Sequence, residues 1–436
     1  MTVPLRIRIG VVGCLAFWAG LNLSAQSSPG LQTLEGYLQQ MQAANPELQA
    51  LMARYESARE DSTVVGALPA PMLQWTHFVE SVQTRTGPQE NILMLSQRIP
   101  WFGKLDSQTT AATAAGEVTW YATQSRLLRL TRQTADLYFD YAYAHTAADL
   151  TQQQLDLLRK LEPVVTEKVR AGASLNALLR LQVEMGKVED QLGSINQQQL
   201  ALAAQIRALL ALPNDSPLPD PEWVAPTHRP DWSAAALSIA VAENHPELKM
   251  IAQQLVSAEA REEVARLERY PDLSVGVNYI QVGDPTVNPT TPDAGRDPWG
   301  VTLSMSLPIW GARNTALRSG AEANRRATIA EQSSRLNTLQ ADLSVSLSRL
   351  DDAHRRLQVY GEDLLDLATQ AATNSRAAYQ NGGATLLEVI DSERSLLDLR
   401  LQHWRAAAEA WRQLVAIQTL TNQPVLGQFV PLFDHE

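Results

Sequence analysis

Leu95 to Lys104 reads LSQRIPWFGK, and Met305 to Asn314 reads MSLPIWGARN. In both stretches an alternating apolar and polar run stops at a proline, and a tryptophan and a glycine precede a long stretch rich in alanine and glutamine. Proline ends a strand because it cannot donate to the ladder, and glycine permits a sharp backbone turn. The phrase therefore predicts two strand-to-helix boundaries. Their residues are Pro100, Trp101 and Gly103, and Pro308, Trp310 and Gly311.

The two stretches belong to a tandem duplication. Asn45 to Leu48 (NPEL) returns as His245 to Leu248 (HPEL), an offset of 200. The segment between the copies has prolines at positions 213, 217, 219, 221, 226 and 230. A helix cannot run through that spacing. We therefore expect one structural repeat at residues 26–212, a proline-rich linker at 213–230, a second repeat at 231–424 and a C-terminal tail at 425–436.

Each repeat carries two strand-like runs. In the second repeat, strict alternation over residues 272–280 and 299–307 predicts two strands with one apolar face. The first repeat has less regular runs at 72–80 and 90–98, with a loop expected between them and an alternation that breaks at His77 and Phe78. Such strands suit the edge of a sandwich or a transmembrane β-barrel. In a barrel the lipid-facing residues would be Leu273, Val275, Val277, Tyr279, Trp299, Val301, Leu303, Met305 and Leu307.

The periodicity changes after each boundary phrase. Apolar and small residues recur with 3-4 spacing from Leu127 to Leu158, and the same ladder returns from Leu336 to Leu367 at an offset of 209. Spacing of this kind, sustained over many turns, predicts coiled-coil packing. We expect long helices within residues 103–211 and 311–420. An uninterrupted helix from Gly311 to Tyr379 would be about 100 Å long.

The composition restricts the partners and the compartment. The 436 residues carry a formal net charge of −11, which argues against nucleic acid as a partner. Arg6 and Arg8 precede an apolar run that ends near Ala25, so residues 1–25 are expected to be a cleaved secretory signal. Cys14 is the only cysteine. Its surroundings faintly match a lipoprotein box, but few apolar residues precede it, so a lipid anchor is the less favoured interpretation.

Four strands are too few for a closed barrel, because the smallest transmembrane barrels have about eight. Lipid also excludes open sheet edges. If the strands cross a membrane, several chains must share one barrel, and a homotrimer would supply twelve strands. The expected fold is thus mainly α with a β-barrel part, the helices forming a long tube below the membrane.

This layout resembles the TolC-like outer-membrane efflux channel family. The resemblance rests on the tandem repeat, on RIPWFGK at Arg98–Lys104, and on glycine-containing turns at 170–175 and 381–386. It implies a trimeric exit duct in the outer membrane of a Gram-negative bacterium, with a twelve-stranded barrel continuous with a periplasmic α-helical barrel. It further implies a periplasmic adaptor and an inner-membrane transporter as partners. The PWFG wording is most similar to the heavy-metal and cation efflux branch.

The resemblance also implies roles for the turns and for an acidic pair. The turns would form the periplasmic tip that contacts the adaptor, although the same residues suit ordinary helix caps. These tip residues are Gly172, Ala173, Ser174, Gly383, Ala384 and Thr385. Glu388 and Asp391 share a helix face and would form a gate of acidic rings, or else an ordinary solvated face. The aligned residues of the first repeat are Ala177 and Arg180.

Other functional classes find little support. The histidines are scattered, and no cysteine nucleophile or GxSxG motif occurs after the signal. We therefore expect no catalytic, cofactor or metal site, and no enzyme activity. The alternative to a channel is a periplasmic coiled-coil scaffold or adaptor, in which the strands form a small soluble domain.

Overall fold

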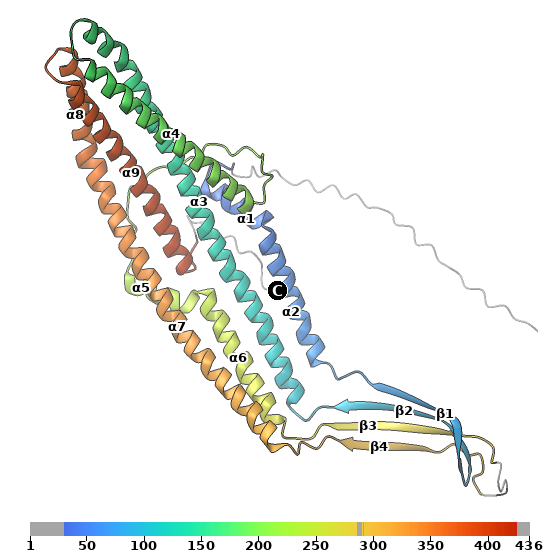
Figure 1. Cartoon of the computed structure of the whole chain (residues 1–436). Helices are drawn as coiled ribbons and strands as arrows, with labels where there is room; N and C mark the ends of the chain where they lie inside the picture. Colours follow the sequence, from blue (N-terminus) through green and yellow to red (C-terminus); the bar gives the residue numbers. More distant parts are fainter. Residues whose placement is uncertain (1–29, 286–289, 291, 425–436) are drawn as a thin grey trace, which may run out of the picture.

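The structure is a computed structural model that describes residues 30–285, 290 and 292–424. The predicted signal at 1–25, with Cys14, and the predicted tail at 425–436 lie outside the described residues. Long helices form an elongated body, and a four-stranded sheet extends from one end of it (Figure 1). No helix in the described part of the chain combines the length and the hydropathy needed to cross a membrane.

The first repeat runs helix, helix, strand, strand, and two long helices. Asn45 ends the first helix and caps the second, because its side chain accepts a hydrogen bond from the backbone N–H of Glu47 at 2.9 Å. The longest helix follows the first boundary phrase and has 67 residues, or about 100 Å. The elements are α1 (Leu34–Ala44), α2 (Pro46–Gly66), β1 (Met72–Thr84), β2 (Gly87–Ile99), α3 (Lys104–Arg170) and α4 (Leu175–Leu209).

The second repeat has the same order of elements. His245 caps the second helix of this repeat, as Asn45 caps the second helix of the first repeat. The long helix of the second repeat differs from the expectation of an uninterrupted helix, because a π-helical segment interrupts it. The elements are α5 (Ala234–Asn244), α6 (Pro246–Leu267), β3 (Leu273–Val282), β4 (Trp299–Met305), α7 (Gly311–Gln358), the π segment η1 (Val359–Leu364), α8 (Leu365–Gln380) and α9 (Leu386–Leu420).

The sheet has the strand order β1-β2-β3-β4 with antiparallel neighbours, so the two repeats meet where β2 pairs with β3. The loop expected after the first strand is largely strand, and the chain turns tightly between Thr84 and Gly87. The β1–β2 register shifts between His77 and Val82, where the sequence alternation breaks. The last strand ends at Met305, two residues earlier than predicted.

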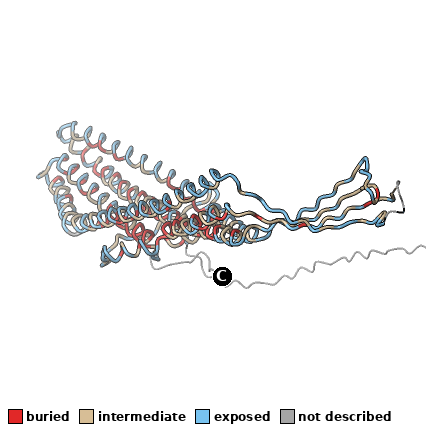
Figure 2. Tube along the Cα trace, turned by 90° about the horizontal axis from the view of Figure 1, so that it is seen from below, coloured by how far each residue is buried: buried red, intermediate tan, exposed pale blue. Residues whose placement is uncertain are grey.

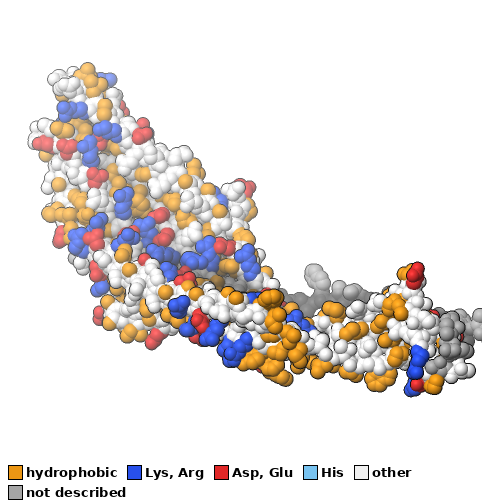
Figure 3. Space-filling model, turned by 60° about the horizontal axis from the view of Figure 1, so that its bottom comes forward, with side chains coloured by type: hydrophobic (Ala, Val, Ile, Leu, Met, Phe, Trp, Pro, Cys, Tyr) orange, Lys and Arg blue, Asp and Glu red, His pale blue; other side chains and the backbone are white. Residues whose placement is uncertain are grey.

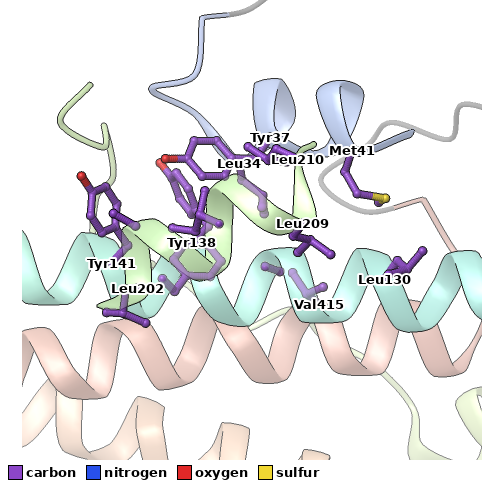
Figure 4. Close-up of a cluster of buried hydrophobic side chains, with 14 of the residues drawn as sticks. Leu34, Tyr37, Met41, Leu130, Tyr138, Tyr141, Leu202, Leu209, Leu210 and Val415 are labelled. Atoms are coloured by element: carbon purple, nitrogen blue, oxygen red, sulfur yellow. The ribbon is translucent and has the colours of Figure 1, made fainter. Parts of the chain in front are cut away.

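The buried residues lie in the helical body, whereas the sheet is largely exposed (Figure 2). One core joins α1, α3, α4 and α9, where Tyr37 and Tyr138 meet edge to face at 5.0 Å between ring centroids (Figure 4). A second core joins α5, α7 and α9, and a third lies among the helices near the tip. The helices are thus packed as expected from the 3-4 ladders.

The proline-rich linker is bound to both repeats. The Tyr138 hydroxyl donates to the carbonyl of Glu222 at 2.6 Å, and the Trp411 indole N–H donates to the carbonyl of Val224 at 2.8 Å. Arg229 forms an ion pair with Asp351 at 2.7 Å. These contacts fix the linker against α3, α9 and α7 of the helical body.

Candidate functional site

One face of the sheet is apolar across all four strands. The register aligns Leu73, Leu95, Val277 and Val301 in one row. Because side chains two residues apart share a face, the neighbouring rows belong to it as well. On one side these rows contain Trp75, Leu93, Tyr279 and Trp299. On the other side they contain Val275 and Leu303 beside the polar Gln97, followed by Ile99, Leu273 and Met305.

This apolar face is open to its surroundings. Val301 is 67% exposed and Leu303 is 65% exposed, while Leu273 is half-buried at the helical end. Leu307 lies beyond β4 and is 68% exposed. Hydrophobic side chains cover much of the strands, and charged groups gather at the far end of the sheet and on the helical body (Figure 3). The structure therefore places the predicted lipid-facing residues on one surface, and their contact with lipid stays a prediction.

A polar cluster ends the apolar face at the end far from the helices. The Asn91 side-chain amide donates to Gln281 Oε1 at 2.7 Å, and its Oδ1 accepts from the Trp75 indole at 3.1 Å. His77 Nδ1 lies 2.9 Å from the same oxygen. Trp101 and Trp310 lie near the opposite end of the sheet. Tryptophans at both limits of an apolar band are typical of proteins that cross a membrane interface.

Asp272 is the centre of the strand-to-helix boundary. Its carboxylate is buried and accepts a hydrogen bond from the backbone N–H of Trp101 at 3.1 Å, from Arg98, and from Lys104 at 3.4 Å. Its backbone N–H donates to the Ser306 hydroxyl at 2.8 Å, and its backbone carbonyl accepts from the Ser306 N–H at 3.0 Å. At the start of β3, Asp272 thus binds the end of β2 through its carboxylate and the end of β4 through its backbone.

The two boundary phrases differ in backbone conformation. Gly103 has a φ of 79°, which favours glycine, whereas Gly311 begins α7 without a positive φ. The turn therefore uses the conformational freedom of glycine at Gly103 and does not use it at Gly311. The Trp101 ring stacks on Tyr270 at 5.1 Å, while Trp310 is 71% exposed. Pro100 directly follows the last residue of β2 as predicted, whereas β4 ends at Met305, three residues before Pro308.

The two tip turns lie together at the end of the body opposite the sheet (Figure 1). Gly172 has a positive φ of 104°. In the other turn the glycine with a positive φ is Gly382, at 79°, one residue before Gly383, which is the predicted tip residue. Ser174 caps α4 and Thr385 caps α9. Ala173 and Ala384 complete the turns between these glycines and caps. All six predicted tip residues thus lie in or beside the two turns.

The predicted acidic pair lies in the first two turns of α9. Glu388 forms a capping box with Thr385, and its carboxylate accepts the backbone N–H of Thr385 at 2.6 Å. Asp391 is exposed and lies 3.7 Å from Arg394. Glu388 therefore caps its own helix. The sequence alone did not distinguish this structural role from a role in a gate.

Sequence reasoning missed two buried carboxylates beside the tip. Glu184 on α4 receives two hydrogen bonds from Arg394 on α9, at 2.6 and 3.1 Å. Glu393 lies 3.0 Å from Arg376 on α8, and burial raises the pKa of its carboxyl. Glu184 and Arg394 are 210 residues apart, so no local pattern could reveal the pair.

A second missed cluster surrounds Glu247 at the start of α6. Its carboxylate accepts from Ser125 at 2.9 Å, from Arg129 at 3.0 Å and from Arg335. Burial alone would raise the pKa of Glu247, but these hydrogen bonds and charges lower it. Burial lowers the pKa of the neighbouring His245 to about 4. The cluster joins α3, α6 and α7, so it is structural.

Residues 237–423, nearly the whole second repeat, match the family model described as outer membrane efflux protein. This match lies in the second repeat, and it supports the resemblance to outer-membrane efflux channels. The chain is 22% identical to the probable outer membrane lipoprotein SilC of Salmonella typhimurium, over 81% of this chain and 77% of that protein. It is also 22% identical to the cation efflux system protein CusC of Escherichia coli K12, over 82% and 79% of the two chains.

Solved structures show the same fold. The outer-membrane channel OprN matches with a TM-score of 0.77 at 17% identity, covering 89% of each chain. A CusC structure matches with a TM-score of 0.75 at 17% identity, covering 91% of this chain and 95% of that one. The predicted resemblance to TolC-like channels is thus confirmed. The chain is therefore similar to outer membrane efflux proteins, which supports a role as an exit duct for efflux.

Proposed function

We propose that three copies of this chain form one twelve-stranded barrel that continues into an α-helical barrel. The observation that supports this most is the four-stranded sheet with an apolar face, in which β1 and β4 pair on one side only within the described residues. Open edges are not stable in lipid, and four strands cannot close. Pairing β4 of one chain with β1 of the next satisfies both edges.

The tip would contact a periplasmic adaptor, which links the duct to an inner-membrane transporter. The contacting residues would be Gly172, Ala173, Ser174, Gly383, Ala384 and Thr385. Their support is their position, since both turns lie at the end farthest from the sheet (Figure 1). Apart from the neighbours of each glycine in the chain, no described residue lies within 4 Å of a side-chain carbon built onto Gly172 or Gly382, so these turn surfaces are open to a partner.

Glu388 and Asp391 would narrow the duct as an acidic gate. Three chains would bring six carboxylates together, and such rings favour cations. Asp391 is the more available of the two, because Glu388 also caps its own helix. The related CusC is described as a cation efflux system protein. We extend that substrate class to this chain, and cation selectivity of the open duct is the property that tests it.

The deciding experiment is native mass spectrometry of the mature protein, extracted from outer membranes in detergent. We expect a trimer, and a water-soluble monomer would contradict the barrel and favour a periplasmic scaffold. In planar bilayers, Asp391→Asn should lower the cation-to-anion permeability ratio more than Glu388→Gln. Glu167→Gln is the matched control, because Glu167 lies near the same tip in an exposed pair with Arg170.

A further inference from the structure

A groove crosses the second repeat where the linker meets the long helices. Residues 225–229 of the linker border it on one side, and α7, η1 and α9 form the other walls. Its volume is about 660 Å³. The polar residues lining it include His228, Asp351, His354, Gln358 and His403.

Two histidines in this groove have a ring nitrogen without a partner. His354 Nδ1 lies 3.2 Å from the carbonyl oxygen of Leu350, which can only accept, so this nitrogen carries the proton. The lone pair of the neutral ring is then on Nε2, which is buried and makes no hydrogen bond. His403 Nδ1 is also buried without a hydrogen bond. Burial lowers the pKa of His403, so its imidazole is neutral at pH 7, as a metal ligand must be.

The π segment packs directly against the His403 ring. A side-chain carbon at Gly361, inside η1, would lie 3.0 Å from Cε1 and 3.3 Å from Nδ1 of His403. Only glycine therefore lets the imidazole lie against this turn without displacement. Short π segments within α-helices often occur at functional sites, and a buried nitrogen without a partner calls for an explanation such as a bound water or ion.

The first repeat provides an internal comparison. The offset of 209 aligns His354 with His145, but α3 continues through this region as a regular α-helix. His145 lies 3.4 Å from Asp220 and packs on Tyr141. The offset of 211 places Leu192 where the second repeat has His403. The second histidine and the π segment thus occur together, in one repeat only.

We propose that His354 Nε2 and His403 Nδ1 bind a divalent transition-metal ion, joining α7 to α9 beside the π segment. Imidazole nitrogens suit Cu²⁺, Zn²⁺ and Ni²⁺, and Cu²⁺ binds such ligands most tightly. Among the residues placed by the structure, no three His, Cys, Asp or Glu side chains gather as a metal site. The protein therefore supplies two ligands, and water completes the coordination. This site lies on the helical body and does not depend on the proposed gate or cargo.

The test uses the full mature protein in detergent, with any purification tag removed and Cu²⁺ as the probe. Calorimetry should give one Cu²⁺ per chain, and electron paramagnetic resonance should show coupling to two nitrogens. His354→Gln or His403→Gln should leave one coupled nitrogen and weaken binding by more than the roughly 10- to 100-fold that a lost outer-shell contact costs. His145→Gln, the repeat-related control, should leave both measurements unchanged.

Gly361→Ala keeps both ligands but adds a methyl group against His403, so we expect weaker binding with little change in helix content by circular dichroism. A wild-type spectrum without two-nitrogen coupling would overturn the site, even if the variants fail to fold. Equal Cu²⁺ affinity in wild type and in the double His354→Gln/His403→Gln variant would also overturn it, because the ion would then bind elsewhere.

Discussion

Arg394 of α9 holds Glu184 of α4 through two hydrogen bonds, from Nη2 at 2.6 Å and from Nε at 3.1 Å. Glu184 is only 8% exposed, whereas the Arg394 side chain is 48% exposed, so a buried carboxylate meets a half-exposed guanidinium in a bidentate geometry. It joins the helical hairpins of the two repeats, and Arg394 also lies beside Asp391. The contact therefore holds the hairpins together close to the proposed gate.

Arg394→Gln should loosen the tip. The substitution leaves the Glu184 carboxylate without its bidentate partner, which favours separation of α4 from α9. We expect a higher mean conductance in planar bilayers, with the trimer intact in detergent. Arg170→Gln is the control, because Arg170 pairs with Glu167 on an exposed surface near the same tip. Unchanged conductance in Arg394→Gln would show that this pair does not restrict the duct.

His245→Asn should reduce the acid sensitivity of the fold. The pKa of His245 is lowered to about 4, so between that pH and about 6.5 the unfolded chain binds a proton that the folded chain does not. Stability is therefore complete above pH 6.5 and falls with pH, by about 2 kcal/mol at pH 5. Asparagine keeps the helix cap, as Asn45 does in the first repeat.

The measurement for His245→Asn is the thermal midpoint of the helical circular dichroism signal at pH 7.5 and pH 5. The wild type should lose more stability between these values than the variant. Glu247 contributes to acid sensitivity only near and below its ordinary pKa, because its own pKa is lowered. An identical loss in both proteins would exclude His245 as the titrating group.

Asp272→Asn should destabilise the junction between sheet and helices. Asp272 is 6% exposed, and it shares the buried Lys104 ammonium with Glu268, at 3.4 and 2.6 Å. Because Glu268 stays beside Lys104, the loss should be smaller than the roughly 3 kcal/mol of a fully broken buried pair. We expect less folded protein in outer-membrane fractions. Asp293→Asn removes a pair that is exposed on both sides and should have almost no effect. Equal yields of the two variants would contradict a central role for Asp272.

Gly87→Ala should prevent correct closure of the β1–β2 turn. Gly87 has a φ of 142°, and an added side-chain carbon would lie 2.2 Å from the carbonyl oxygen of Gly283. Gly172→Ala is the matched control, since Gly172 also has a positive φ but nothing lies within 4 Å. The control should lose only about 1–2 kcal/mol of backbone energy. Heat-modifiable migration in gels would separate them, and similar folded fractions would refute the steric argument.

Local patterns predicted most of the elements. The strict alternation in residues 272–280 and the 3-4 ladders after each boundary phrase are short-range signals, and the corresponding strands and helices are present. The misplacements have local causes too. A register shift after His77 hid the length of β1, and a π segment that begins at Val359 interrupted an otherwise regular ladder.

The sequence by itself determined the duplication, the linker, the order of strands and helices, and the apolar face of the second pair of strands. It could do so because periodicity and proline spacing act over a few residues. Only the tertiary structure brought Arg394 to Glu184, Asp272 to Lys104, and His354 and His403 into one groove. These partners are far apart in sequence. Burial strengthens the interactions of their charges and lone pairs, and a local sequence pattern does not show which residues become buried together.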